Sequence, residues 1–129
     1  MKIDTRGLTN CSVIEGGEQI SLGMVDERGE ALELKVSTSD ACAIAMTLPK
    51  LLNLSMKEKF QDENLRYVFP LDDWKIETTP DGKQVIVTLS TGQGYEVSFA
   101  SPPDTCRLLG SALTAPLEQR MTRSAMKVN

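Results

Sequence analysis

Apolar residues fall at alternate positions in two pairs of neighbouring segments. The first pair covers residues 19–25 and 31–36, and the second covers residues 84–90 and 95–99. This spacing places the apolar side chains on one face of a strand whose other face meets water. After each pair, apolar residues recur every three or four positions, which is typical of an amphipathic helix. The pattern therefore predicts strands followed by a helix, twice.

Turn residues mark the ends of these strands and add one more strand to each half. Further strands are expected near residues 8–15 and 71–78, where short apolar stretches precede turns. Gly16 and Gly17 after the first of them favour a two-residue hairpin. The other turns are expected at Asp26–Gly29, Thr79–Gly82 and Thr91–Gly94, each ending in glycine.

The two halves resemble each other along their length. The matched pairs are Cys11 with Trp74, Val13 with Ile76, Leu22 with Val87, Leu34 with Phe99, and Ser37 with Ser101. The offsets are 63, 63, 65, 65 and 64 positions, and they change only where turns tolerate insertions. A repeat of this kind indicates a duplicated structural unit.

We therefore predict an α+β fold with the order βββα–βββα. Its six strands are mostly antiparallel, its two helices lie on one face of the sheet, and a pseudo-two-fold axis relates the halves. A chain of 129 residues suits a single domain. Its expected parts are repeat one (about 8–54), a connection (about 55–70), repeat two (about 71–117) and a basic C-terminal tail (118–129).

The two helices are expected to begin at similar motifs. The stretches STSDAC (37–42) and SPPDTC (101–106) each place a serine three residues before an aspartate, ahead of an apolar run. This is a capping-box pattern, in which the serine oxygen accepts an N–H of the first helical turn. The second helix is expected to begin one residue late, because a residue before Pro103 avoids the helical region.

Two prolines and two cysteines follow these starts. Pro49 and Pro116 are expected to end or kink the helices. Cys42 and Cys106 lie beside apolar neighbours, and since free cysteine is often buried we expect both to be core residues.

Charge and composition restrict the classes of partner. The formal net charge is −4, and the tail carries only Arg120, Arg123 and Lys127 against Glu118. This charge disfavours nucleic-acid binding, which requires a basic stripe. No apolar run behind the first charges resembles a signal peptide, and no run spans a bilayer. We expect a cytoplasmic protein of bacterial or phage origin.

The residue types for common catalytic sites are missing. The chain has no histidine, which excludes Ser-His-Asp and Cys-His arrangements. The two glycines of TGQGYE lie between expected strands, not before a helix as in a phosphate loop. Asp40 and Asp104 have a role in helix capping. We therefore expect no enzyme activity, no cofactor and no metal.

Two groups of residues are candidates for binding. The outer face of the first helix carries Ala43, Met46, Thr47 and Lys50, where the second helix has a more polar stripe. A helix apolar on most sides is buried on more than one of them, so we expect the first helix to pack against the second helix or against a partner chain. Its outer face is a candidate interface with another protein or in a homodimer. Asp73, Trp74 and Tyr95 form a candidate ligand patch.

The favoured function is a small non-enzymatic protein-binding, adaptor or regulatory protein. In size and charge the chain resembles small acidic α+β proteins that bind other proteins, such as secretion chaperones and inhibitors. One alternative is a small-molecule sensor with a pocket between sheet and helices, lined by Trp74 and Tyr95. Another is an acidic inhibitor or nucleic-acid mimic that presents its carboxylates in rows.

Overall fold

The protein is described here by a computed structural model, which covers residues 1–116. The predicted basic tail, 118–129, lies outside the described residues. The chain divides into two compact units, Met1–Tyr67 and Val68–Asn129, and each is described by itself.

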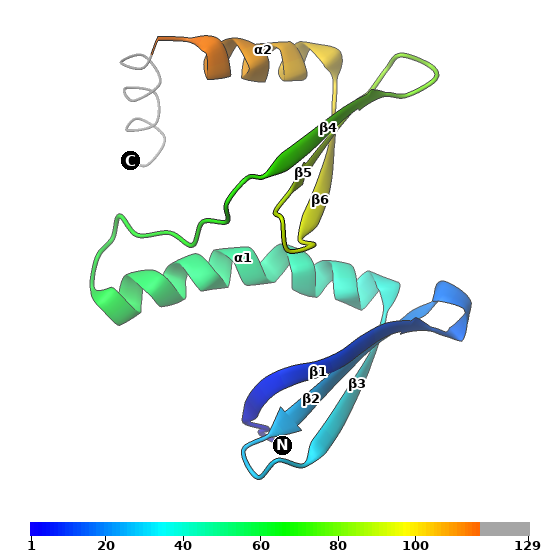
Figure 1. The fold of residues 1–129 in the computed structure, drawn as a ribbon, viewed down its shortest axis with the longest axis vertical. Coiled ribbons are helices and arrows are strands. Elements are labelled where there is room, and N and C mark those ends of the chain that lie inside the picture. Colours follow the sequence, from blue (N-terminus) through cyan, green and yellow to red (C-terminus); the bar gives the residue numbers. More distant parts are fainter. Residues whose placement is uncertain (117–129) are drawn as a thin grey trace. The chain divides into compact units, whose positions relative to one another are not determined.

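The first unit is a three-stranded antiparallel sheet followed by a long helix (Figure 1). Its elements are β1 (Thr5–Ile14), the short 3-10 turn η1 (Glu15–Gly17), β2 (Gln19–Asp26), β3 (Ala31–Ser37) and α1 (Thr38–Phe60). The strand order is β1-β2-β3, so each strand pairs with its neighbour in the sequence.

The second unit has the same order of elements. These are β4 (Asp73–Thr78), β5 (Val85–Ser90), β6 (Glu96–Ser101) and α2 (Pro103–Thr114). Its strands form a second antiparallel sheet, in the order β4-β5-β6. The predicted α+β fold with the order βββα–βββα is confirmed, and its six strands are divided between two three-stranded sheets. The placement of both helices on one face and the pseudo-two-fold axis stay predictions.

The second and third strands of the two units pair in the same register. Leu22 lies opposite Leu34 between β2 and β3, and Val87 lies opposite Phe99 between β5 and β6. Leu22 and Val87 are 65 positions apart, and so are their partners Leu34 and Phe99. The two hairpins are therefore equivalent residue by residue. This shared register supports the duplication.

The first strands match with an offset different from the one expected. Leu22 pairs with Cys11, and its counterpart Val87 pairs with Ile76. Cys11 therefore corresponds to Ile76, and the predicted match of Cys11 with Trp74 is wrong by two residues. Because side chains alternate with a period of two, a slip of two residues leaves the apolar pattern of a strand unchanged.

A bulge in β1 also distinguishes the two first strands. Leu8 pairs with Met24 and Cys11 with Leu22, so two residues of β1 lie opposite Gly23 alone. A Cβ atom at Gly23 would lie 2.6 Å from the carbonyl oxygen of Asn10, which explains a glycine inside this strand. The bulge returns Leu8 to the same face as the apolar residues that follow it.

Three of the expected turns are confirmed. Gly29, Gly82 and Gly94 each have a positive φ and donate an N–H to the carbonyl oxygen three residues earlier. The expected two-residue hairpin at Gly16 and Gly17 is instead the 3-10 turn η1, which also includes Glu15 with a φ of 52°.

The turn between β4 and β5 is further held by Asp81. Its carboxylate accepts the backbone N–H of Lys83 at 2.9 Å and the hydroxyl of Thr79 at 2.7 Å. These two hydrogen bonds, the one from Lys83 first, hold the pKa of Asp81 below its usual value.

The two helices begin differently in spite of their similar motifs. In α1 the hydroxyl oxygen of Ser37 accepts the N–H of Asp40 at 3.1 Å, as predicted for a helix cap. In α2 the capping position is taken by Pro102, and no side chain caps the helix. Ser101 stays in β6, paired with Val85. The helix begins one residue late as expected, but the capping role expected for Ser101 is wrong.

The two prolines also have different effects. Pro49 was expected to end or kink the first helix. It lies inside α1, which continues to Phe60, so it does not end the helix, and the kink stays a prediction. Pro49 removes one intrahelical hydrogen bond, while Lys57 and Lys59 in the last turn and a left-handed Gln61 stabilise the C-terminal end. In contrast, α2 ends at Thr114, before Pro116, as predicted.

Candidate functional site

Each sheet has one face that is almost entirely apolar. Residues paired directly across antiparallel strands lie on the same face, so the registers define these faces. The β1–β3 apolar face consists of Leu8, Cys11, Val13, Ile20, Leu22, Met24, Leu32, Leu34 and Val36. The β4–β6 apolar face consists of Trp74, Ile76, Val85, Val87, Leu89, Val97 and Phe99.

The opposite faces are mostly polar and are held by side-chain hydrogen bonds. The hydroxyl of Ser21 donates to a carboxylate oxygen of Glu33 at 3.0 Å, and the hydroxyls of Thr88 and Ser98 lie 2.7 Å apart. Ser21 and Thr88 are the buried residues within 1–116. These polar side chains therefore find hydrogen-bond partners on their own face of the sheet.

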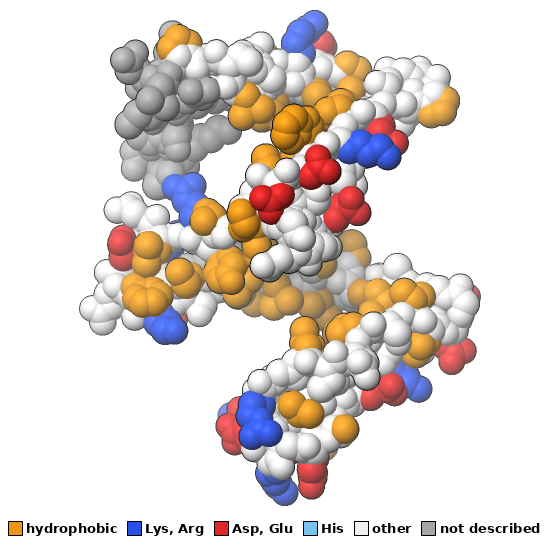
Figure 2. Space-filling view, in the orientation of Figure 1, with side chains coloured by type: hydrophobic (Ala, Val, Ile, Leu, Met, Phe, Trp, Pro, Cys, Tyr) orange, Lys and Arg blue, Asp and Glu red, His pale blue; other side chains and the backbone are white. Residues whose placement is uncertain are grey.

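The apolar faces, by contrast, are open. No apolar side chain within residues 1–116 is buried, and Val13, Trp74 and Phe99 expose 69%, 64% and 57% of their surface. Figure 2 shows apolar side chains at the surface along α1 and beside β4. Burial of apolar surface is the main favourable contribution to folding, and large open apolar faces mark interaction sites.

The helix of the first unit does not cover its own sheet, and the chain connection explains why. No residue separates the end of β3 at Ser37 from the start of α1 at Thr38. The N–H of Thr38 donates to Glu18 O at 3.2 Å, and its hydroxyl lies 3.2 Å from Gly17 O. These bonds hold the first turn of α1 at the end of the sheet, and the two diverge from that junction (Figure 1).

The second unit has the same short junction. Only Pro102 separates β6 from α2, and its backbone is extended, with φ −60° and ψ 150°. Pro102 and Pro103 both have restricted φ angles, so this connection is stiff. Figure 1 shows α2 leaving the end of the β4–β6 sheet in the same manner as α1 leaves its sheet.

Helix α1 is apolar on two sides. At about 100° per residue, a broad apolar arc runs along one side, and the predicted interface residues lie on the other. The broad arc consists of Ala41, Ile44, Ala45, Leu48, Leu51 and Leu52. The interface stripe consists of Ala43, Met46, Thr47 and Lys50. Ile44, Leu48 and Met46 expose 37%, 49% and 77% of their surface.

The structure brings the four residues of the interface stripe together on one exposed face. Their positions follow the spacing of three and four residues that places side chains side by side on a helix. The hydroxyl of Thr47 donates to Ala43 O at 2.7 Å, which satisfies the one hydroxyl in the stripe. The remaining contact surface is the Met46 side chain, the Ala43 methyl group and the stem of Lys50.

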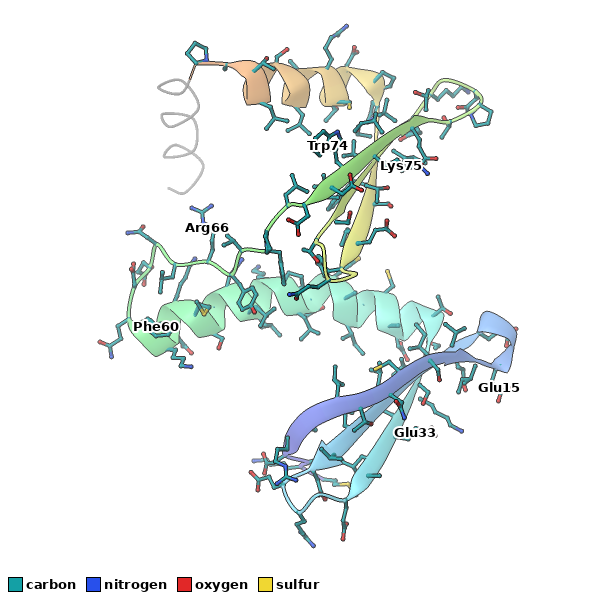
Figure 3. The ribbon with its side chains drawn as sticks, viewed as in Figure 1. Glu15, Glu33, Phe60, Arg66, Trp74 and Lys75 are labelled. Atoms are coloured by element: carbon teal, nitrogen blue, oxygen red, sulfur yellow. The ribbon has the colours of Figure 1, made fainter. Side chains whose placement is uncertain are left out.

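The structure does not bring the three residues of the predicted ligand patch to one point. Trp74 belongs to the β4–β6 apolar face, and the neighbouring Asp73 points to the opposite face. Figure 3 shows the same alternation one residue further, with Trp74 and Lys75 on opposite sides of β4. Tyr95 stacks on Phe69 with ring centroids 4.7 Å apart.

Phe69 is a neighbour of Tyr95 that the sequence pattern missed. It precedes Pro70 in the stretch before β4, where no periodicity indicates which way a side chain points. A nearby carboxylate was also missed: Asp72 accepts the N–H of Gly92 and so holds the turn between β5 and β6.

The cysteines are less buried than expected. Cys42 is exposed, with its sulfur 3.9 Å from that of Met46, Cys106 is half-buried, and Cys11 is exposed on the β1–β3 apolar face. The expectation that Cys42 is a core residue is therefore wrong for the chain taken alone. The reason is that no element of the first unit packs over this part of α1.

Two further features were not found in residues 1–116. Residues 1–116 contain no cluster of three or more side chains able to hold a metal ion. Neither described helix combines the length and the apolar character needed to span a membrane. Comparisons with protein-family models, with curated proteins and with solved structures find no match.

Proposed function

We propose that this chain is a cytoplasmic, non-enzymatic protein-binding protein of adaptor or regulatory type. In this proposal the interface stripe of α1 binds the partner protein. The observation that carries it is the exposure of apolar side chains on two sides of α1, because a single layer packed on one side leaves the other open.

The shape of the stripe favours a protein partner over a small molecule. Ala43 to Lys50 spans about 10 Å of a convex helix surface, whereas small ligands prefer concave sites. Met46, with its flexible and polarisable side chain, can adapt to different partner surfaces. An amphipathic helix that lies across α1 would bury such a stripe through side chains at helical spacing.

Positive charges in and beside the stripe indicate which groups the partner surface carries. Lys50 lies in the stripe, and Lys57 follows it seven residues later on the same side of the helix. A carboxylate on the partner would pair with either ammonium group, most favourably at the edge of the apolar contact. The proposed partner surface is therefore apolar at its centre and acidic at one border.

The proposal is tested with a variant in the stripe and a matched variant outside it. Thr47→Glu adds a carboxylate to the stripe, and Gln93→Glu adds one to the turn between β5 and β6. The tagged chain is used to isolate a partner from cells, and that partner is then purified and titrated by calorimetry. Thr47→Glu is expected to weaken binding at least about tenfold, since an unpaired charge would be desolvated, while Gln93→Glu binds like the original chain.

Two results would remove the proposal. One is equal affinity of the Thr47→Glu variant and the original chain for the purified partner. The other is tight binding of a metabolite by a chain that isolates no protein, which would favour the sensor alternative.

A further inference from the structure

The first unit carries two open apolar surfaces that fit each other. The β1–β3 apolar face offers nine apolar side chains from three strands, while the broad arc of α1 is convex and offers six. In α+β proteins such a helix commonly packs on such a sheet face. Here the broad arc of α1 is not packed on the β1–β3 apolar face, although both belong to the same unit.

The chain connection prevents the simplest solution. Because α1 follows β3 without a loop, and Thr38 is bonded to the carbonyls of Gly17 and Glu18, α1 cannot fold back onto its own sheet without breaking these bonds. A surface that fits its counterpart but cannot reach it within one unit can still meet the counterpart of a second copy.

We propose that a second copy of this chain covers the β1–β3 apolar face, in a two-fold exchange. The broad arc of α1 from each copy lies on the β1–β3 apolar face of the other. One two-fold rotation generates both contacts, because in such a dimer the helix touches the partner's sheet and the sheet touches the partner's helix.

The dimensions of the two surfaces agree with this arrangement. Three strands of about seven residues give a face of roughly 14 by 23 Å. The broad arc, from Ala41 to Leu52, is about 17 Å long on a helix roughly 10 Å wide. Together the two surfaces present roughly 500 Å² of projected area per chain. A standard interface buries about 800 Å² of accessible surface per partner, and the accessible area of a corrugated surface exceeds its projection.

The second unit repeats the same arrangement. It has its own open apolar face on β4–β6 and its own helix held at the end of the sheet by Pro102. Its helix α2 likewise exposes Leu108 and Leu109, by 68% and 51%. The second unit therefore also exposes an apolar sheet face and apolar side chains on its helix.

This dimer is separate from the proposed function. It uses the broad arc of α1, whereas partner binding uses the interface stripe on the other side. Either the dimer or the partner binding can therefore be disproved without the other. Adjacent residues of α1 provide matched variants for the two tests.

The first test compares Leu48→Glu in the broad arc with Thr47→Glu in the interface stripe. Sedimentation equilibrium of the full chain is expected to give twice the mass of 14.2 kDa. Leu48→Glu is expected to weaken the dimer about a hundredfold, since an unpaired carboxylate would face an apolar sheet, and Thr47→Glu leaves it unchanged. A monomeric original chain would overturn the proposal, as would equal weakening by both variants.

The second test does not depend on the folding of Leu48→Glu. One chain keeps Cys11 as its single thiol, with Cys42→Ala and Cys106→Ala. The other has Leu48→Cys as its single thiol, with all three native cysteines replaced by alanine. The two chains are unfolded together, refolded and treated with a short bismaleimide. Efficient coupling of the two chains, mapped by mass spectrometry, is expected, because Cys11 adjoins the centre of the sheet face.

The control for coupling is Thr47→Cys in place of Leu48→Cys. Its thiol lies about 100° around the helix from that of Leu48→Cys, off the centre of the broad arc, so coupling to Cys11 is expected to fall severalfold. Equal coupling at the two positions, or a dimer in which Cys11 couples to neither, would overturn the exchanged arrangement.

Discussion

Ser37 and Ser101 occupy equivalent places in the repeat but differ in what they bond. Ser37 caps α1 through the N–H of Asp40, whereas Ser101 pairs within β6 and caps nothing. Replacing a capping serine by alanine costs about 1 kcal/mol. Ser37→Ala is therefore expected to lower the free energy of unfolding by about that amount, and Ser101→Ala by clearly less, in urea titrations at one protein concentration. Equal losses would contradict the assigned cap.

Single residues show where local chemistry could be predicted. The cap at Ser37 and the turns at Gly29, Gly82 and Gly94 follow from motifs whose partners lie within a few residues. The capping role predicted for Ser101 is wrong because Pro102 and Pro103 follow it and the helix begins at the second of them. The predicted burial of Cys42 is wrong for a different reason. Burial depends on what packs over a residue, and the local sequence does not determine that.

At the scale of elements, α1 holds a proline in its interior. Pro49 cannot donate the N–H that would otherwise bond Ala45 O, and a proline in a helix interior costs about 3 kcal/mol relative to alanine. Pro49→Ala is expected to raise the free energy of unfolding by up to about 3 kcal/mol, measured by urea titration and by helical circular dichroism. A lower stability would show that the proline's local geometry is used in packing.

The order of elements could be predicted because two periods are distinct in the sequence. Alternation marked the strands and the spacing of three and four marked the helices, so βββα–βββα followed. The register of the first strands did not follow, since a slip of two residues preserves alternation, as Cys11 and Ile76 show. Helix α1 also continues past Pro49 to Phe60, where an end or a kink was expected.

At the scale of the whole molecule, periodicity predicts which face of each element is apolar but not what covers it. The apolar residues of β2, such as Leu22, were recognised as facing one way. Their cover was expected from the two helices of the chain, but within each unit the helix diverges from its sheet at a short junction. Helical spacing alone predicts that Ala43, Met46, Thr47 and Lys50 share one side of α1, and their role as an interface stays a prediction. The patch of Asp73, Trp74 and Tyr95 requires adjacent strand residues on one face, which the alternation of Asp73 and Trp74 prevents.

A second copy that covers the β1–β3 apolar face makes unfolding depend on protein concentration. The urea midpoint of the full chain is measured over a hundredfold range of protein concentration. If folding requires two copies, the midpoint rises throughout, by an amount equivalent to about 1.4 kcal/mol of stability for each tenfold increase. A midpoint that stays constant over this range, with a cooperative transition, would contradict the exchanged dimer.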